Sequence, residues 1–419
     1  MNSVDLMLKY IEEQDLEKAQ RQFEKIKRDG SESDMFEGAE QLIPYGFYDE
    51  AKQLLEILLT NYPDESELKV MIAELCIEMG NDEEAYHYLE TIQEDDPQYP
   101  SALLMEADLY QMQGLYEVSE HKLKKAKEIL KDNYVIDYAL AELYMTQGRF
   151  LEATRIFQTI IEKGVDELGE LDLYSRLAEA LSAGGAFEEA IPYYEKSLNQ
   201  QKEINVQFGY ALTCYQAGNY SKAIEAFKQL KEMDPDYHSL YLYLARSYEF
   251  EEKIDEALKE VEEGILLDEF NKDLQYYAGK LALKKNDEDK AEKYLRESLS
   301  LDPEFIEAAL TLNKLFIHQE RYEDVIDITS IFDEQGIIDP QLAWDAAISY
   351  EQTEQYDLAI KQYESAYIEL NNNDEFLRDY GYFLIEEGRR AEALRIFEQL
   401  LNNAPNNEEW IQVVNSLNE

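Results

Sequence analysis

The sequence has 419 residues, of which 45% are apolar and 31% are charged. Acidic residues outnumber basic ones by 91 to 39, so the formal net charge is −52 at pH 7. Such a surface repels nucleic acid phosphates and anionic membranes, which argues against both as partners, and it attracts basic ones.

The N-terminal residues 1–20 lack a basic segment followed by an apolar core, so no secretory signal is predicted. No stretch approaches the roughly 18 uninterrupted apolar residues of a membrane-spanning helix. Two cysteines in a chain of this length do not suggest a disulfide scaffold. We therefore expect a cytoplasmic protein without membrane insertion.

Apolar residues recur at positions i, i+3 and i+4 along nearly the whole chain, which predicts helices throughout. A small residue, usually followed four positions later by an aromatic residue or leucine, marks a repeat. Most successive marks are 34 residues apart. In chain order they are Ala19, Ala51, Ala85, Ser119, Ala153, Ala190, Ala223, Ala257, Ala291, Val325, Ala359 and Ala393.

A second series of small residues lies twelve positions before the first, at Ala39, Ala73, Ala107, Ala141, Ala178, Ala211, Ala245, Gly279, Ala347 and Gly381. Paired helices can approach closely at these two positions because no large side chain separates their backbones. Proline recurs twelve residues after the first mark, at Pro63, Pro97, Pro235, Pro303 and Pro405. Proline disfavours helix in the residue before it, so each of these is expected to end a hairpin.

This pattern resembles the tetratricopeptide repeat (TPR) family, which has small residues, Tyr, Phe and Pro at fixed places in 34 residues. Ala141, Tyr144, Ala153 and Phe157 carry one copy. The resemblance covers essentially the whole chain and indicates a long, acidic, bacterial-type member.

The resemblance implies an all-α, right-handed superhelical solenoid of about twelve TPR hairpins in residues 1–404. Residues 405–419 are then a capping helix for the last hairpin. Val325 and Asn313 make the tenth repeat atypical. One interval has 37 residues, with an insertion near residues 162–172 that we expect to bend the superhelix.

The sequence contains no pattern typical of catalysis or of cofactor binding. Cys76 and Cys214 fall at a position that is Tyr in other repeats, so they are interpreted as buried core thiols. The four histidines lack further ligands at metal-site spacing, and no phosphate loop or nucleophile motif is present. We expect a protein that is not an enzyme, with no metal and no cofactor.

In the TPR family the first helices line a concave groove, and the residue after the small first-helix position points into it. The acidic residues at this position in repeats two to six are Glu40, Glu74, Asp108, Glu142 and Glu179. The basic residues in repeats eight to ten are Arg246, Lys280 and Lys314. Equivalent residues lie side by side in a solenoid, so both series are candidate partner-binding residues. The alternative is a solvated face, because glutamate also favours helices for its own sake.

Four residues before this groove position lies a mostly apolar series, which includes Tyr138, Phe208, Tyr276 and Trp344. A stripe at this spacing either packs inside the array or supplies aromatic anchors beside the charges. These four aromatic residues are the candidate anchors.

The resemblance thus implies a non-catalytic scaffold or adaptor that binds a protein or peptide in its concave groove. A basic part of the partner would face repeats two to six, and an acidic part would face repeats eight to ten. The alternatives are a peptide-sensing regulator and a self-assembling scaffold whose acidic and basic halves pair between molecules.

Overall fold

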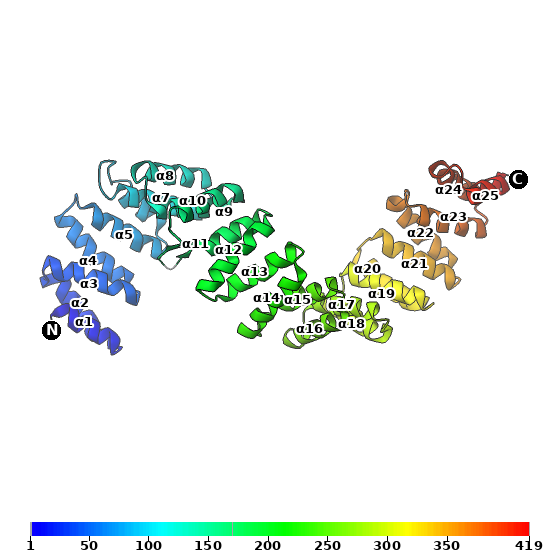
Figure 1. Ribbon diagram of the computed structural model, residues 1–419, viewed down its shortest axis with the longest axis horizontal. Coiled ribbons are helices and arrows are strands. Elements are labelled where there is room, and N and C mark those ends of the chain that lie inside the picture. Colours follow the sequence, from blue (N-terminus) through cyan, green and yellow to red (C-terminus); the bar gives the residue numbers. More distant parts are fainter. Residues whose placement is uncertain (1, 170, 419) are drawn as a thin grey trace. The chain divides into compact units, whose positions relative to one another are not determined.

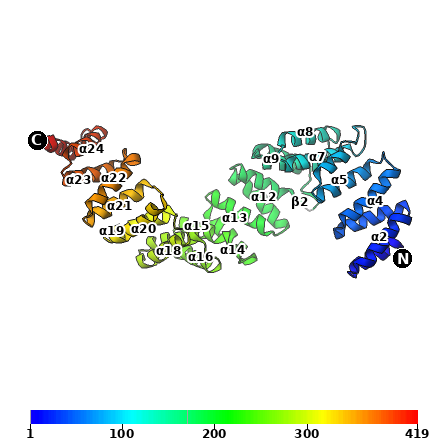
Figure 2. The same cartoon turned by 180° about the vertical axis from the view of Figure 1, so that it is seen from behind.

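The computed structural model describes residues 2–169 and 171–418, which contain 25 α-helices, one short 3₁₀ helix and two strands of two residues each. The prediction of an all-α repeat solenoid is confirmed. The chain divides into two compact units, residues 1–202 (unit 1) and 203–419 (unit 2), and each is described by itself. In both views of the ribbon, successive helices of each unit are stacked in sequence order (Figures 1 and 2).

Unit 1 consists of six hairpins. Its helices are α1 (Ser3–Glu12), α2 (Leu16–Asp29), α3 (Glu32–Leu42), α4 (Tyr48–Asn61), α5 (Ser66–Glu78), α6 (Asp82–Leu89), α7 (Tyr99–Met112), α8 (Tyr116–Ile129), α9 (Tyr134–Thr146), α10 (Phe150–Glu162), α11 (Leu173–Ala183) and α12 (Phe187–Gln200). The 3₁₀ helix η1 (Ile43–Tyr45) follows α3. The odd-numbered helix of each pair is the first helix of its hairpin.

Unit 2 consists of six further hairpins and one additional helix. Its helices are α13 (Ile204–Gln216), α14 (Tyr220–Met233), α15 (Ser239–Phe250), α16 (Ile254–Leu267), α17 (Lys272–Lys284), α18 (Glu288–Leu301), α19 (Ile306–His318), α20 (Tyr322–Gln335), α21 (Pro340–Gln352), α22 (Tyr356–Leu370), α23 (Asp374–Glu386), α24 (Arg390–Asn403) and α25 (Glu408–Asn418).

The turn inside each hairpin follows one recurring backbone pattern. The N–H of Leu115 donates to the carbonyl of Tyr110 at 2.8 Å, and Gly114 between them has φ 74°. Glu320 occupies the same left-handed conformation in a later hairpin, with φ 57°. This hydrogen bond satisfies a carbonyl that would otherwise lack a partner at the end of the first helix, and it holds the turn in which the chain reverses direction.

The small residues lie where the two helices of a hairpin meet, as expected. Ala51, Ala85 and Ala153 have no exposed surface. A Cβ atom added to Gly279 of α17 would lie 2.7 Å from Cγ of Leu295 in α18. The pair can approach this closely only because a glycine faces the leucine.

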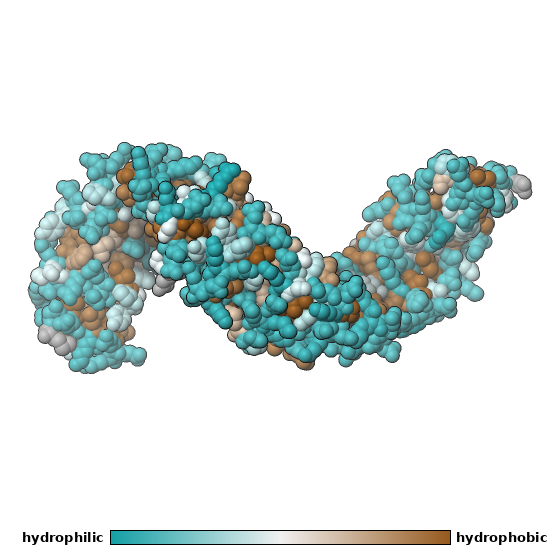
Figure 3. All heavy atoms as spheres, viewed as in Figure 1, coloured by the Kyte–Doolittle hydropathy of each residue, from teal (hydrophilic) through white to brown (hydrophobic). Residues whose placement is uncertain are grey.

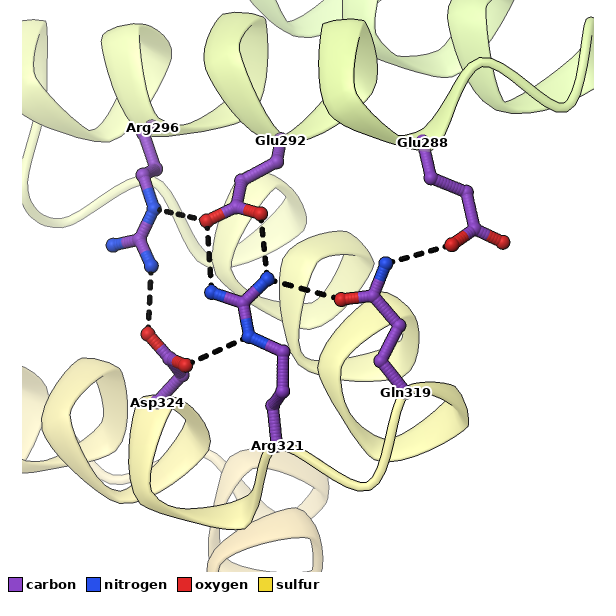
Figure 4. Close-up of polar contacts among 6 residues, drawn as sticks. All are labelled: Glu288, Glu292, Arg296, Gln319, Arg321 and Asp324. Atoms are coloured by element: carbon purple, nitrogen blue, oxygen red, sulfur yellow. Dashed lines mark hydrogen bonds and ion pairs between the residues drawn. The ribbon is translucent and has the colours of Figure 1, made fainter.

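Neighbouring hairpins are also joined by polar contacts between their second helices, shown for α18 and α20 in Figure 4. Arg321 donates from Nη1 to Glu292 at 2.6 Å and from Nε to Asp324 at 2.9 Å. Arg296 donates to the same two carboxylates, at 2.8 Å each. The hydrogen bonds from Arg321 and Arg296 outweigh burial and lower the pKa of Glu292 to about 2.

The same arrangement recurs in unit 1. Arg149, at the start of α10, donates to Glu120 of α8 at 2.7 Å and to Glu152 at 3.0 Å. Lys124 contacts the same Glu120 at 2.6 Å, as Arg296 contacts Glu292. We call each set an outer clamp, because it ties the second helices of adjacent hairpins together.

The insertion that the sequence places near residues 162–172 forms a short hairpin. Strands β1 (Glu167–Leu168) and β2 (Leu171–Asp172) pair antiparallel. Gly169, with φ 65°, supplies the left-handed residue of its turn. This small strand element is a departure from the expected all-helical chain. It arises because three extra residues must be accommodated between α10 and α11.

At the C-terminus, α25 packs against α24. Trp410 is 8% exposed, and its ring lies 5.7 Å from that of Phe397. This contact suits the predicted capping helix, although the boundary at residue 405 stays a prediction. The face in Figure 3 is mostly hydrophilic, with hydrophobic residues visible in scattered patches.

Candidate protein-binding surface

The charged residues after the small first-helix position lie on consecutive first helices in each unit, and we call them the rungs. In unit 1 the acidic rungs are Glu40 on α3, Glu74 on α5, Asp108 on α7, Glu142 on α9 and Glu179 on α11. In unit 2 the basic rungs are Arg246 on α15, Lys280 on α17 and Lys314 on α19. The surface formed by the rungs and their neighbours is called the first-helix face of each unit.

Two acidic rungs pair with Arg176 of α11, a residue that the sequence pattern did not single out. Its Nε donates to Oε1 of Glu142 at 3.0 Å, and its Nη2 pairs with the second oxygen of that carboxylate. Its Nη1 pairs with Glu179 on its own helix. Two parallel bonds to one carboxylate are the strongest geometry for this pair. A single guanidinium therefore bridges the rungs of two neighbouring repeats.

Arg176 is three residues before Glu179, the rung of its own helix, and it lies between this rung and the rung of the preceding first helix. We call the position three residues before a rung its slot. The slots before Glu74 and Asp108 hold Met71 and Met105, which are half-buried. Methionine is uncharged and adaptable in shape. These two slots therefore offer no cation to the carboxylates beside them.

The three acidic rungs nearest the N-terminus are exposed: Glu40, Glu74 and Asp108. Within residues 2–169 and 171–418, none of their side chains has a hydrogen-bond or ion-pair partner. The side chain of Asp108 is accessible to solvent, yet loss of hydration among the surrounding atoms raises its pKa. A carboxylate that is accessible and partly desolvated gains more from a cation than one in open water.

The first two basic rungs of unit 2 lie against aromatic rings. The guanidinium carbon of Arg246 is 5.9 Å from the ring centroid of Tyr243 and 5.6 Å from that of Tyr277. Nζ of Lys280 is 5.5 Å from the ring centroid of Tyr276. In the part of the chain that the structure describes, neither rung forms an ion pair with a carboxylate.

The third basic rung, Lys314, is exposed beside a buried carboxylate. Asp345 of α21 is only 3% exposed and accepts hydrogen bonds from Gln341 at 2.9 Å and from Asn313 at 3.4 Å. Burial raises the pKa of Asp345 to about 6, although these two amides and Lys314 oppose the shift. The third rung thus has a buried acidic neighbour on the next first helix.

The four candidate aromatic anchors all pack against rings in their own unit. Trp344 is 9% exposed and the other three are half-buried. The ring-to-ring distances are 5.9 Å for Tyr138 with Phe157, 4.9 Å for Phe208 with Tyr237, 5.1 Å for Tyr276 with Phe305 and 5.6 Å for Trp344 with Phe376. These contacts account for the stripe as packing, and a further role in binding stays a prediction.

The two cysteines lie in the core and not on the first-helix faces. Cys76 and Cys214 are both buried, and burial raises the pKa of the Cys76 thiol to about 11. No cluster of three or more His, Cys, Asp or Glu side chains among the described residues could hold a metal ion. No described helix is long and apolar enough to cross a membrane.

The slot residues could have been found from the sequence by one further step. Residues three apart share a face of a helix. The position three residues before each rung can therefore be aligned across the repeats in the same way as the rung. That alignment places Arg176 next to acidic rungs, and Tyr243 and Tyr277 next to a basic one.

Comparison with known proteins gives matches along most of the chain. Residues 340–407 match a family model described as YpiA-like, C-terminal tetratricopeptide repeats. Residues 111–165 match one described as YpiA-like, tetratricopeptide repeats. Other tetratricopeptide repeat models match residues 46–109 and 273–305, and a model of anaphase-promoting complex subunit 3 matches residues 183–264.

Among curated proteins, the chain is similar to the TPR repeat-containing protein YpiA of Bacillus subtilis. The two are 42% identical over 407 residues, which cover 97% of this chain and 96% of that protein. TPR repeat-containing protein MJ1428 of Methanocaldococcus jannaschii is 26% identical and covers 42% of this chain and 35% of its own. A solved TPR fragment from Cytophaga hutchinsonii aligns at 19% identity with a TM-score of 0.49, over 57% of this chain and 97% of that one.

Proposed function

Because the chain belongs to the YpiA-like family of tetratricopeptide repeat proteins, we propose that it is a non-catalytic adaptor that binds a segment of a partner protein on its first-helix faces. Repeat proteins of this class generally act through protein–protein interactions, and their stacked hairpins provide extended binding surfaces. The observation that carries the proposal is the run of unpaired acidic rungs on α3, α5 and α7.

The partner segment for unit 1 is basic. Glu40, Glu74 and Asp108 are exposed on three consecutive first helices and have no counter-ion among the described residues. Each partly exposed pair with a partner cation would contribute about 1 kcal/mol or less, so several must act together. A ladder of rungs in neighbouring repeats supplies that number.

Arg176 supports this proposal as an internal example of how a cation is held. It bridges Glu142 and Glu179 from the slot between them. The slots at Met71 and Met105 are flanked by acids in the same register. A partner arginine would therefore find the same pair of carboxylates there.

The test measures binding of a fluorescein-labelled peptide of nine arginines by anisotropy at about 0.1 M salt. Changing Glu40 and Glu74 to Gln and Asp108 to Asn should weaken binding about ten-fold or more. The matched control changes Glu83, Glu117 and Glu128 to Gln, which removes three charges from second helices and should alter affinity less than two-fold. Equal losses in both variants would mean that the net charge, and not the first-helix face, attracts the peptide.

A second pair of variants tests the slots. In the double variant Met71→Arg, Met105→Arg, the new guanidinium groups should occupy the acidic rungs as Arg176 does and compete with the peptide. The control Met112→Arg, Val118→Arg adds the same charge at exposed positions outside the slots. The slot variant should bind at least five-fold more weakly than this control. The reading fails if the two bind alike.

Self-assembly is the second candidate, since unpaired acids lie in unit 1 and unpaired cations in unit 2. Copies that join through these charges would sediment as larger species at low salt and as monomers at about 0.5 M salt. A sedimentation coefficient independent of both salt and concentration would remove this candidate.

A further inference from the structure

We propose that Arg246 is the centre of a carboxylate-binding site on the first-helix face of unit 2, which takes a glutamate or aspartate side chain of an acidic partner segment. This inference rests on the proposed adaptor function and extends it by assigning a ligand to one residue. The site consists of Arg246 on α15, Tyr243 and Tyr277 beside it, and Lys280 on the next first helix.

The rings of Tyr243 and Tyr277 fix the position of the guanidinium. They lie 5.9 and 5.6 Å from its central carbon and come from α15 and α17, so the arginine is held between two repeats. A cation–π contact leaves the N–H groups of a guanidinium that point away from the ring able to donate. Those donors match the two oxygens of a carboxylate.

A carboxylate on the same helix as Arg246, that of Glu249, is already engaged. Glu249, one turn later on α15, pairs with Lys284 at 2.5 Å and accepts a hydrogen bond from the hydroxyl of Tyr277. Although burial alone would raise the pKa of Glu249, these partners lower it, so it stays ionised and occupied. Arg246 has no ion-pair partner in residues 2–169 and 171–418.

The local charge contrasts with that of the whole chain. Lys280 occupies the next rung, is exposed, and also lacks an ion-pair partner within the described residues. Two unpaired cations on adjacent first helices thus stand in a chain with a net charge of −52. An acidic partner is repelled by the chain at long range and attracted at this place, which favours recognition by contact over non-specific attraction.

Aromatic side chains extend the site toward the end of α15. Tyr215 lies 5.6 Å from Tyr243 and 6.1 Å from Phe250. Phe250 is 56% exposed and stacks on Tyr220 at 4.3 Å. Burial raises the pKa of Tyr215 while the nearby Arg246 opposes the rise, so its hydroxyl stays protonated and can donate. The segment that fits carries an apolar or aromatic residue beside its acid.

The experiment uses the full-length chain and two labelled hexapeptides, one alternating glutamate with phenylalanine and one alternating glutamine with phenylalanine. Binding is measured at about 0.3 M salt, where the repulsion from distant charges is screened to within roughly 6 Å. The wild type should bind the glutamate peptide at least ten-fold more tightly than the glutamine peptide. Equal affinity for both would overturn the inference.

Variants of Arg246 test whether this residue is responsible for the preference for the glutamate peptide over the glutamine peptide. In Arg246→Gln the preference for glutamate should fall below two-fold, and in Arg246→Lys it should be intermediate, because lysine keeps the charge but loses the planar fork. The control Arg395→Lys, at an exposed arginine with no ion pair in the described residues, should behave as the wild type. If Arg246→Gln retains the full preference, the carboxylate binds elsewhere and the assignment is wrong.

The outcome is separable from that of the adaptor proposal. Loss of glutamate recognition with intact binding of the nine-arginine peptide would overturn this site alone. If neither the nine-arginine peptide nor the glutamate peptide binds, the adaptor proposal is overturned as well. Circular dichroism of each variant confirms that the helices are retained.

Discussion

At the scale of single residues, Asp345 is the clearest case of a carboxyl group whose ionised form is disfavoured by burial. It is 3% exposed, and its hydrogen bonds come from two neutral amides at 2.9 and 3.4 Å. Asn313 also has a buried Oδ1 atom with no hydrogen-bond partner among the described residues. A buried carboxylate without a cation in contact is costly, because hydration is lost and not replaced.

We therefore expect Asp345→Asn to stabilise the protein at pH 7 by about 1–3 kcal/mol. The folded-state pKa of about 6 lies above the ordinary value of 3.8, so the native state holds the proton more tightly. The wild type should then lose stability as pH rises from about 4 to about 6, relative to the variant. The new amide N–H can also donate to Asn313 after a flip of that side chain.

The measurement is urea unfolding of both proteins at pH 4, 5, 6 and 7. The comparison between them removes the contribution of all other acids. A difference that does not change with pH would show that Asp345 titrates normally in the folded state.

At the scale of elements, the outer clamps show how adjacent hairpins keep their register. Each clamp places an arginine at the start of one second helix against a glutamate of the preceding second helix, as Arg321 and Glu292 do. The pair is partly exposed, so its contribution is limited by solvent screening. Because the arginine bonds both to its own helix and to the neighbouring one, the clamp opposes sliding between repeats.

Arg321→Gln should lower the free energy of unfolding by about 1 kcal/mol and increase amide hydrogen exchange in the first turn of α20. The loss should be smaller at high salt. The lowered pKa of Glu292 means that this contribution is present above about pH 4.5 and disappears as pH falls toward 2. Arg395→Gln, which removes an exposed arginine without an ion pair in the described residues, serves as the control. The same change in both variants would exclude a specific clamp.

At the scale of the whole molecule, each unit contains six complete hairpins with their own buried cores. In a repeat protein, stability is approximately the sum of the hairpins and of the interfaces between neighbours. A fragment that keeps its internal interfaces therefore keeps most of its stability per residue.

We expect fragments 1–202 and 203–419 each to be helical by circular dichroism and to unfold cooperatively in urea. The fragments end in the loop between α12 and α13, so no helix is cut. Fragments cut inside a hairpin, for example after Ala183, provide the comparison and should be less stable. An unfolded 1–202 fragment would contradict the division into two units.

The sequence by itself determined the period and the local structure. Residues that repeat every 34 positions, such as Ala51 and Ala85, must meet the same neighbours in every hairpin, so their burial follows from spacing alone. The burial of Cys76 and Cys214 followed for the same reason. The positions of the rungs on first helices were equally predictable, because each rung is one residue from a small marker.

Only the tertiary structure decided which charges are paired. Arg176 reaches Glu142 across the interface between two repeats, and the short hairpin at residues 167–172 lies in the same interval. Asp345 is buried by side chains from neighbouring helices, including Asn313 of α19. Such outcomes depend on which side chains from different hairpins meet and how much water they displace, and these are properties of packing in three dimensions.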